Sequence, residues 1–326
     1  MTDGWLLESA AYDPALNLAV EESLLLGGVP NPSLYLWQNS HTVVIGRGQN
    51  AWKECRTALL TEEGGTLVRR STGGGAVYHD MGNLNFSFVM PKHLYDVPRQ
   101  LDVIRRAVAA FGIHTERSGR NDIVITATGG KFSGNAFRVT GDTALHHGTL
   151  LYAVDMDRLG RYLAPSKQKM QAKGVGSVRA RVDNLVNHAP GMTIAQLKQV
   201  LYEAFKAEYG GGMPVDWQEN LDTGTVEQLR EKYASWDWTY GRTPRFDILL
   251  THRFLWGEVE LMLSLRQGRV HGVQCFSDAM DADLTDRLTA ALEGCVFSPQ
   301  SLSDRLSESG FSEDRDIAAW IRAQEF

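Results

Sequence analysis

The chain of 326 residues is poor in cysteine, in long apolar runs and in positive charge, and each absence excludes a class of protein. Its three cysteines (Cys55, Cys275 and Cys295) are odd in number and lack metal-ligand spacing, which excludes a disulfide framework and favours reduced thiols. No stretch approaches the roughly 18 consecutive apolar residues of a membrane span. A net charge of −6 argues against a dedicated nucleic-acid binder, whose domain would be basic.

What is present is ordinary for a globular protein, with 43% hydrophobic and 22% charged residues. The length predicts about two domains. The first residues, Met1 to Trp5, lack the basic and apolar regions of a signal peptide. We therefore expect a cytoplasmic protein with no membrane and no nucleic-acid partner, and a monomer.

The pattern of apolar residues predicts an α+β chain rather than a doubly wound sheet, because short strands outnumber the helices that cover them. Residues 12–26 and 193–209 have helical spacing, and 33–37 and 42–45 read as the two strands of a hairpin. A tryptophan-rich stretch followed by Gly241–Pro244 indicates a boundary. We expect domains at 1–244 and 245–326, the second a small α+β unit containing a hairpin and two helices.

The most informative stretch, Arg69 to Asp80, reads RRSTGGGAVYHD. Three consecutive glycines cost entropy on folding, so they favour a place where the backbone approaches a ligand or takes positive φ. Successive N–H groups there can form a nest for an anion, and the paired guanidiniums of Arg69 and Arg70 can hold the same anion. The apolar residues Ala76 to Tyr78 indicate a ligand with an anionic head and an apolar body. The alternative is a glycine-rich hairpin with solvated arginines.

A second glycine pattern, Gly46-x-Gly48-x-x-Ala51, follows a strand and matches a dinucleotide-binding fingerprint. The region lacks the alternation of strands with long crossover helices that such a domain needs. We expect instead that this turn carries Arg47 toward the same pocket as Arg70.

Further candidate residues lie downstream. Asp122 is a candidate Mg²⁺ ligand, with a turn cap as the alternative. Lys131 begins a strand after two glycines and can act as a point charge on a phosphate, although most single lysines are surface residues. His146 and His147 point to opposite faces of a strand, which disfavours a zinc site. The basic, glycine-punctuated stretch 173–185 reads as a loop that can close over an anion.

Taken together, these motifs resemble lipoate–protein ligase A of the biotin/lipoate protein ligase superfamily. The motifs are 69–80, 119–122, 131–134, 146–149 and 173–185, and the similarity extends from about Tyr12 through the C-terminal unit. The resemblance implies a catalytic domain of mixed sheets with covering helices, akin to class II aminoacyl-tRNA synthetases, and a small C-terminal accessory domain.

The implied reaction uses ATP and Mg²⁺ to convert lipoate to lipoyl-AMP and pyrophosphate, and then transfers the lipoyl group to a lysine. The implied acceptors are lipoyl domains of 2-oxoacid dehydrogenase E2 subunits and the glycine-cleavage H protein. Lys131 and Arg70 would be catalytic, and Asp122 would bind the metal. The nucleotide and acyl-phosphate contacts would be Arg70, Gly73, Gly74, Gly75, Ala76, Val77, Tyr78, Asn121, Lys131, Ala136, His147 and Gly148.

Three alternatives remain. An octanoyl or lipoyl transferase of the same superfamily would need a cysteine thioester, but no cysteine lies between Arg56 and Gln274. A non-catalytic lipoate-binding protein would be expected to lose Lys131 or the arginine pair. Biotin ligation is a weaker third choice.

Overall fold

The computed structural model describes residues 4–29, 31–119, 121–163, 169–172, 182–243, 246–277, 279, 281 and 283–326. Its strands are β1 (Trp5–Glu8), β2 (Ser33–Trp37), β3 (Thr42–Ile45), β4 (Thr66–Arg69), β5 (Val77–His79), β6 (Asn83–Pro91), β7 (Thr115–Ser118), β8 (Asp122–Ile125), β9 (Lys131–Thr140), β10 (Thr143–Leu151), β11 (Lys169–Ala172), β12 (Met213–Pro214), β13 (Phe246–Phe254), β14 (Gly257–Arg266) and β15 (Arg269–Ser277). Its α-helices are α1 (Pro14–Gly27), α2 (Ala51–Glu54), α3 (Thr57–Glu62), α4 (Val97–Ala109), α5 (Met156–Tyr162), α6 (Ile194–Tyr209), α7 (Trp217–Asn220), α8 (Thr223–Ala234), α9 (Trp236–Thr239), α10 (Leu284–Leu292), α11 (Pro299–Ser307) and α12 (Ser312–Arg322). None of the described helices combines the length and the apolar character needed to cross a membrane.

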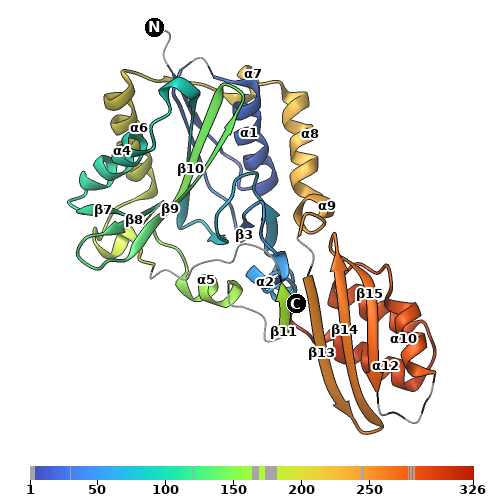
Figure 1. Cartoon of the computed structure of the whole chain (residues 1–326). Coiled ribbons are helices and arrows are strands. Elements are labelled where there is room, and N and C mark those ends of the chain that lie inside the picture. The colour runs from blue at the N-terminus through green and yellow to red at the C-terminus, as the bar shows by residue number, and fades with distance from the viewer. Residues whose placement is uncertain are drawn as a thin grey trace.

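The larger part of the chain is built on an eight-stranded mixed sheet in the order β12-β1-β2-β6-β10-β9-β8-β7. Helices α4 and α6 pack on one face, and α1 and α8 pack against each other on the opposite side (Figure 1). Helix α1 begins where predicted, because Asp13 caps it and Pro14 occupies its first position. Helix α6 begins at a capping box formed by Thr193 and Gln196. The α+β prediction is confirmed.

A separate three-stranded sheet, in the order β4-β3-β5, carries the glycine-rich motif between β4 and β5. It packs through Val44 and Val68 against the cluster that contains α1. The predicted hairpin of 33–37 with 42–45 is wrong, although both strands exist. Strand β2 pairs with β1 and β6 in the large sheet, whereas β3 pairs with β4 and β5.

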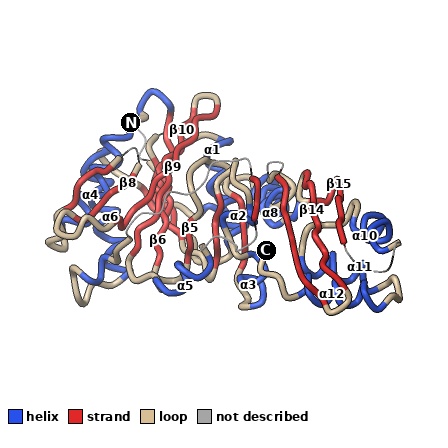
Figure 2. The backbone as a smooth tube through the Cα atoms, turned by 60° about the horizontal axis from the view of Figure 1, so that its bottom comes forward, coloured by secondary structure: helices blue, strands red, loops and turns tan. Residues whose placement is uncertain are grey.

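The C-terminal part is a sheet in the order β11-β13-β14-β15, whose buried face packs on helices α10, α11 and α12 (Figures 1 and 2). Every second residue of β14 is buried, as a one-sided antiparallel sheet requires. The edge strand β11 comes from residues 169–172, far upstream, and pairs with 246–249 of β13. The C-terminal sheet therefore contains a strand from the segment that precedes residue 173.

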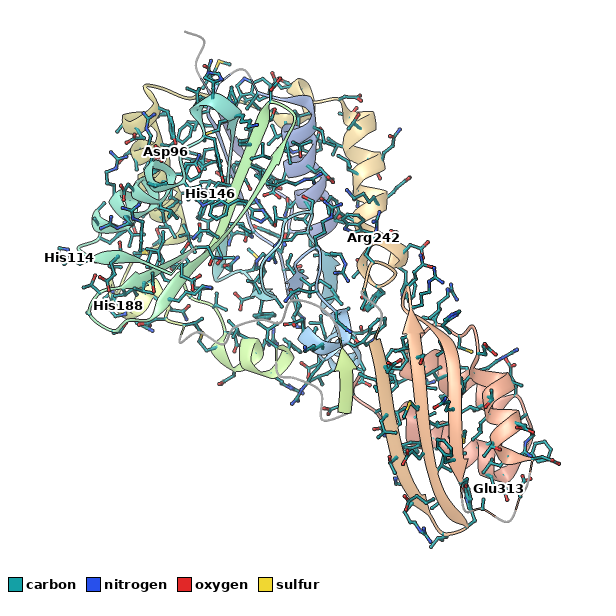
Figure 3. The ribbon with its side chains drawn as sticks, viewed as in Figure 1. Asp96, His114, His146, His188, Arg242 and Glu313 are labelled. Atoms are coloured by element: carbon teal, nitrogen blue, oxygen red, sulfur yellow. The ribbon has the colours of Figure 1, made fainter. Side chains whose placement is uncertain are left out.

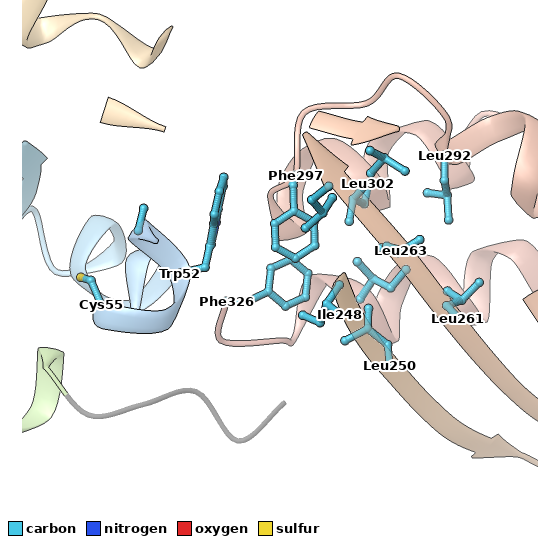
Figure 4. Close-up of a cluster of buried hydrophobic side chains, with 14 of the residues drawn as sticks. Trp52, Cys55, Ile248, Leu250, Leu261, Leu263, Leu292, Phe297, Leu302 and Phe326 are labelled. Atoms are coloured by element: carbon cyan, nitrogen blue, oxygen red, sulfur yellow. The ribbon is translucent and has the colours of Figure 1, made fainter. Parts of the chain in front are cut away.

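The two parts meet in an aromatic contact beside α2 (Figure 4). Trp52 lies against Phe297 with ring centroids 5.2 Å apart, and Phe297 stacks on the C-terminal Phe326 at 4.4 Å. The Thr57 hydroxyl donates to the Phe326 main-chain oxygen at 2.9 Å. All three rings are almost completely buried. Phe326 thus belongs to the contact between the larger part of the chain and the C-terminal part.

Replacing Phe326 with alanine removes a fully buried ring and leaves a cavity, so the free energy of unfolding should fall by about 3–5 kcal/mol. Denaturant unfolding of the full chain measures the loss. The matched control is Glu325→Ala at the neighbouring residue, whose side chain is 55% exposed and lies 3.7 Å from Arg56. An exposed ion pair contributes about 0–1 kcal/mol, so equal losses in the two variants would contradict the assigned packing.

Candidate active site

A cavity of about 420 Å³ opens between the glycine-rich loop, helix α1 and the strands β9 and β10. Eleven of the predicted site residues line it: Arg70, Gly74, Gly75, Ala76, Val77, Asn121, Asp122, Lys131, Ala136, His147 and Gly148. Two others, Gly73 and Tyr78, are not among its lining residues. Residues from four of the five predicted motifs thus meet at one place.

Tyr78 lies outside the cavity because of strand alternation in β5. Val77 and His79 face the cavity, whereas the Tyr78 ring points to the other face and packs near His41 and Tyr162. The Tyr78 side chain is therefore not part of the cavity.

Arg70 is buried, and its guanidinium binds the loop itself. It donates to the main-chain oxygens of Gly73 at 2.6 Å, Gly75 at 2.8 Å and Val44 at 3.2 Å. Burial lowers its pKa to about 10, so the group stays a cation at neutral pH. Because a trans peptide points its C=O and the next N–H in opposite directions, the N–H groups of Gly74 and Ala76 point away from Arg70. Arg70 therefore orients the loop amides.

Arg69 is fully buried and does not face the cavity. Its guanidinium donates to the main-chain oxygens of Gln49 at 2.7 Å and Gly46 at 3.1 Å, and to that of Thr239. The expectation that both arginines hold one anion is wrong for Arg69, because carbonyl groups on two sides already occupy its donors.

The loop needs glycine at particular positions. Gly74 has φ of +90°, which favours glycine. A Cβ on Gly46 would lie 2.2 Å from the Gly74 oxygen, so only glycine lets the two turns approach each other. The Gly46–Gly48 pattern thus supports the glycine-rich loop, and no doubly wound sheet exists in the described part of the chain.

Lys131 reaches into the cavity and forms an ion pair with Asp122, with Nζ and Oδ1 2.7 Å apart. Both side chains are about one-quarter exposed. Asn121 holds the adjoining turn against β9, because its amide donates to the Asn135 main-chain oxygen at 2.7 Å and Asn135 donates back to the main chain of Asn121 at 2.9 Å. The Lys131 ammonium group therefore projects into the cavity from a strand whose neighbouring turn is held in place by hydrogen bonds.

The two histidines of β10 point to opposite faces, as predicted. His146 is buried between Gln100 and Asn135, 2.8 Å from each, in the interior of the large part (Figure 3). His147 faces the cavity, where its Nδ1 lies 2.8 Å from Glu21 and its Nε2 lies 2.8 Å from the Thr72 hydroxyl. Neither belongs to a metal-binding group of three or more His, Cys, Asp or Glu side chains within the described residues.

His147 completes a buried chain of hydrogen bonds beneath the loop. The Arg70 Nε donates to the Thr72 hydroxyl at 3.0 Å, which donates to the Nε2 of His147. The Nδ1–H of His147 then donates to the Glu21 carboxylate, which also accepts from Ser87. The buried Glu21 carboxyl group and the buried Arg70 guanidinium are thus linked through Thr72 and His147, and each has the hydrogen-bond partners that a buried polar group needs.

The sequence reasoning missed Glu21, Ser87, Trp37 and Asn85. The available signal was the pair Glu21-Glu22 inside a helix of otherwise apolar spacing, because two adjacent acids on a buried helix need partners. Trp37 donates through its indole to Ser87 at 2.9 Å and lines the apolar side of the cavity with Leu18 and Val44.

Three other predictions concern residues near the cavity. Arg47 does not share the cavity of Arg70, because its side chain lines a different hollow with Arg138 and Trp238. Residue 120 of the motif 119–122 and residues 173–181 of the predicted closing loop lie outside the described residues. The described end of that loop is fixed to the site, since the Asp183 N–H donates to the Lys131 main-chain oxygen at 3.0 Å.

Two family models of known proteins match the chain. Residues 13–206 match the family model of the lipoyl protein ligase A/B catalytic domain. The chain belongs to this family. Residues 243–320 match the bacterial lipoate protein ligase C-terminus. Family membership gives the chain a lipoate-ligase type of function.

Solved structures of lipoate ligases share its fold. P. falciparum LipL1, solved in complex with lipoate, is 29% identical with a TM-score of 0.66, and the match covers 98% of this chain and 99% of that one. A bipartite lipoate protein ligase from Thermoplasma acidophilum, solved with its E2 lipoyl domain, is 23% identical, covers 73% and 96%, and has a TM-score of 0.62. A lipoate-protein ligase A bound with ATP is 24% identical, covers 73% and 98%, and has a TM-score of 0.60.

The buried histidines make stability depend on pH. Burial, with smaller effects of Arg70 and His147, lowers the pKa of His79 to about 3, and burial also lowers that of His146 to about 3. An unfolded histidine has a pKa of about 6.5, so below that value the unfolded chain binds more protons than the folded chain. The stability is therefore fully present above about pH 6.5 and falls as the pH decreases toward 3.

We expect the free energy of unfolding to fall by about 1 kcal/mol for each of these histidines between pH 7.5 and 5.5. Denaturant unfolding at both pH values measures this, with His79→Asn reducing the fall by about half. The control is His114→Asn, at an exposed position (Figure 3). If His79→Asn kept the full pH dependence, His79 would not be buried in its neutral form.

Proposed function

We propose that the chain is an ATP-dependent lipoate–protein ligase that forms lipoyl-AMP and transfers the lipoyl group to a lysine of an acceptor protein. The observation that carries this proposal is one cavity in which the Lys131 ammonium, the glycine-loop amides and an apolar wall meet. Lipoate has a carboxylate at one end and an apolar body, and ATP brings three phosphates. The cavity offers a matching surface to each of these groups.

In the first step, a lipoate carboxylate oxygen attacks the α-phosphorus of ATP and pyrophosphate leaves. Two anions approach each other, so positive charge is needed where they meet. Lys131 supplies it directly, at the carboxylate and α-phosphate oxygens. Arg70 acts through the backbone by keeping the Gly74 and Ala76 amides turned away from itself. Orientation does the rest, because no covalent enzyme intermediate is needed.

Asp122 fits the role of a Mg²⁺ ligand in part. Among the described residues that line the cavity it is the one carboxylate, and magnesium in nucleotide sites is held by one or two carboxylates together with substrate phosphates. When bound, Mg²⁺ would neutralise charge on the phosphate oxygens. Asp122 would hold it only after its ion pair with Lys131 is exchanged for substrate.

In the second step, the lysine amine of an acceptor attacks the acyl carbon of lipoyl-AMP, an amide forms, and AMP leaves with loss of one amine proton. We propose E2 lipoyl domains and the H protein as acceptors. We also propose that residues 1–244 form the catalytic domain and 245–326 the accessory domain, which contributes no lining residue to the cavity in its described part.

A transferase that works through a cysteine thioester is a poorer candidate. Cys55 is buried in the core, and burial raises the pKa of its thiol far above the usual range. Burial likewise raises the pKa of Cys275, to about 11, and that of Cys295. A thiol nucleophile needs a lowered pKa and access to substrate, and none of the three lines the cavity.

Lipoate-dependent ATP–pyrophosphate exchange without acceptor tests the first step. We expect exchange with lipoate in the wild type, and a loss of about 10²–10³-fold in Lys131→Ala, as when one donor to a developing charge is removed. The control Lys92→Ala changes an exposed lysine outside the cavity and should exchange normally. Near-normal exchange in Lys131→Ala would assign the charge role to another residue, and no exchange in the folded wild type would contradict adenylation.

The triple variant Cys55→Ala, Cys275→Ser, Cys295→Ser tests the thiol mechanism. Because no thiol takes part in the proposed reaction, exchange and transfer rates should stay within about twofold of the wild type. Pyrophosphate release and acceptor mass measure the two steps. Loss of transfer in a variant with an unchanged unfolding midpoint would establish a thioester and overturn the ligase mechanism.

A further inference from the structure

A second hollow, of about 490 Å³, lies beside the cavity and is rich in cations. We call it the basic hollow. Its lining contains four cations and two carboxylates, together with Ser235 and Trp238: the cations are Arg47, Arg138, Lys232 and Arg242, and the carboxylates are Glu22 and Asp237. Its positive charge contrasts with the net charge of −6 of the whole chain. Its cations come from a loop, from β9 and from the α8–α9 region, so the fold and not a basic stretch of sequence assembles them.

At the buried floor of the basic hollow, the carboxylate of Glu22 offsets the positive charges of Arg138 and Lys232. Glu22 is almost fully buried and accepts from Arg138 at 2.8 Å, from Lys232, and from the Tyr233 hydroxyl at 2.8 Å. Burial acts to raise the pKa of Glu22, but these hydrogen bonds outweigh it and hold the pKa below its usual range. One carboxylate thus serves two cations at the floor.

The exposed residues of the rim are Arg47, Arg242 and Asp237, so two cations face one carboxylate there and the rim stays positive. Arg47 and Arg242 are exposed, and neither has a carboxylate within ion-pair distance in the part of the chain that the structure describes. The Arg242 guanidinium lies over the Trp238 ring, 5.1 Å from its centroid, at the outer edge of the large part (Figure 3). Lys232 lies over the same ring at 4.3 Å, so Trp238 separates floor from rim.

The basic hollow is attached to the active site by short, buried links. The Trp238 indole donates to the Arg69 main-chain oxygen at 2.7 Å, next to Arg70. The Arg47 N–H donates to the Thr72 oxygen at 2.8 Å, in the glycine-rich loop. On β9, Ala136 lines the cavity and Arg138 lies two residues further on the same face. A partner bound over this rim would therefore be held beside the cavity.

We infer that the basic hollow is the docking surface for an acidic patch on the acceptor protein, whose lysine must reach the cavity. The inference rests on the proposed transfer reaction. A small anion would need free donors that converge at the floor, but the floor is occupied by Glu22. Exposed rim cations instead suit a protein surface, where they speed encounter and fix orientation more than they add affinity.

The test measures the two steps separately in the double variant Arg47→Glu, Arg242→Glu. The probe is an unmodified E2 lipoyl domain that the wild type lipoylates. We expect the KM for this domain to rise on the order of tenfold and its dependence on salt to flatten, with lipoate-dependent ATP–pyrophosphate exchange unchanged. The matched control, Arg117→Glu with Arg266→Glu, makes the same charge change at exposed sites away from the hollow and should move the KM by less than about twofold.

Each outcome decides a different question. An unchanged KM with unchanged salt dependence would overturn the docking surface while leaving the ligase proposal intact. Reduced exchange with an unchanged KM for the lipoyl domain would assign these arginines to the first step and also overturn the docking surface. An equal rise in the KM of the control double variant would show a general charge effect. Absence of exchange in the wild type would instead remove the proposed function itself.

Discussion

The structure of the site depends on two buried guanidiniums that bind main-chain carbonyl groups. Burying a charge is costly unless hydrogen bonds replace its water shell. Arg69, with no exposed surface, meets this cost with oxygens from the turn at 46–49 and from the segment at 239–243. Arg70 does the same with oxygens of the glycine-rich loop. The neighbouring residues Arg69 and Arg70 therefore hold together the turn at 46–49, the glycine-rich loop and the segment at 239–243. These hydrogen bonds fix the loop that forms one wall of the cavity.

The consequence for the proposed reaction is that Arg70 can prepare the loop amides for an anion without touching the anion itself. Fixing the carbonyls of Gly73 and Gly75 on Arg70 also fixes the opposite direction of the amides that follow them. Such preorganised dipoles need no rearrangement when charge develops, which is the property that makes them effective in catalysis. Beneath the loop, the chain through Thr72, His147 and Glu21 resists rotation of the guanidinium.

The sequence predicted local features well and global ones poorly. Helix α1, the strands at 33–37 and 42–45 and the position of Lys131 follow from helical spacing, apolar patterning and glycine placement, which are local. The pairing of β2 and β3 was wrong because their register is set by partners elsewhere in the chain. The prediction that Arg69 binds an anion was wrong for a similar reason, because its partners also come from distant segments of the chain. An arginine can bind an anion or, like Arg69, five main-chain carbonyl groups, and which of these occurs depends on its burial in the fold. The two adjacent residues Arg69 and Arg70 give no sign of this difference in the sequence.

Lys131 combines a fixed backbone with a replaceable side-chain partner. Its main chain is held by the bridge to Val182 and by the Asp183 N–H, so the position from which the side chain projects is set. Its ion pair with Asp122 is partly exposed, and such pairs contribute only about 0–1 kcal/mol. Exchanging that carboxylate for a substrate carboxylate or phosphate therefore costs little. In the proposed reaction, the released Asp122 would become available to a cation brought in with the nucleotide, so a single exchange of partners would prepare both charges for adenylation.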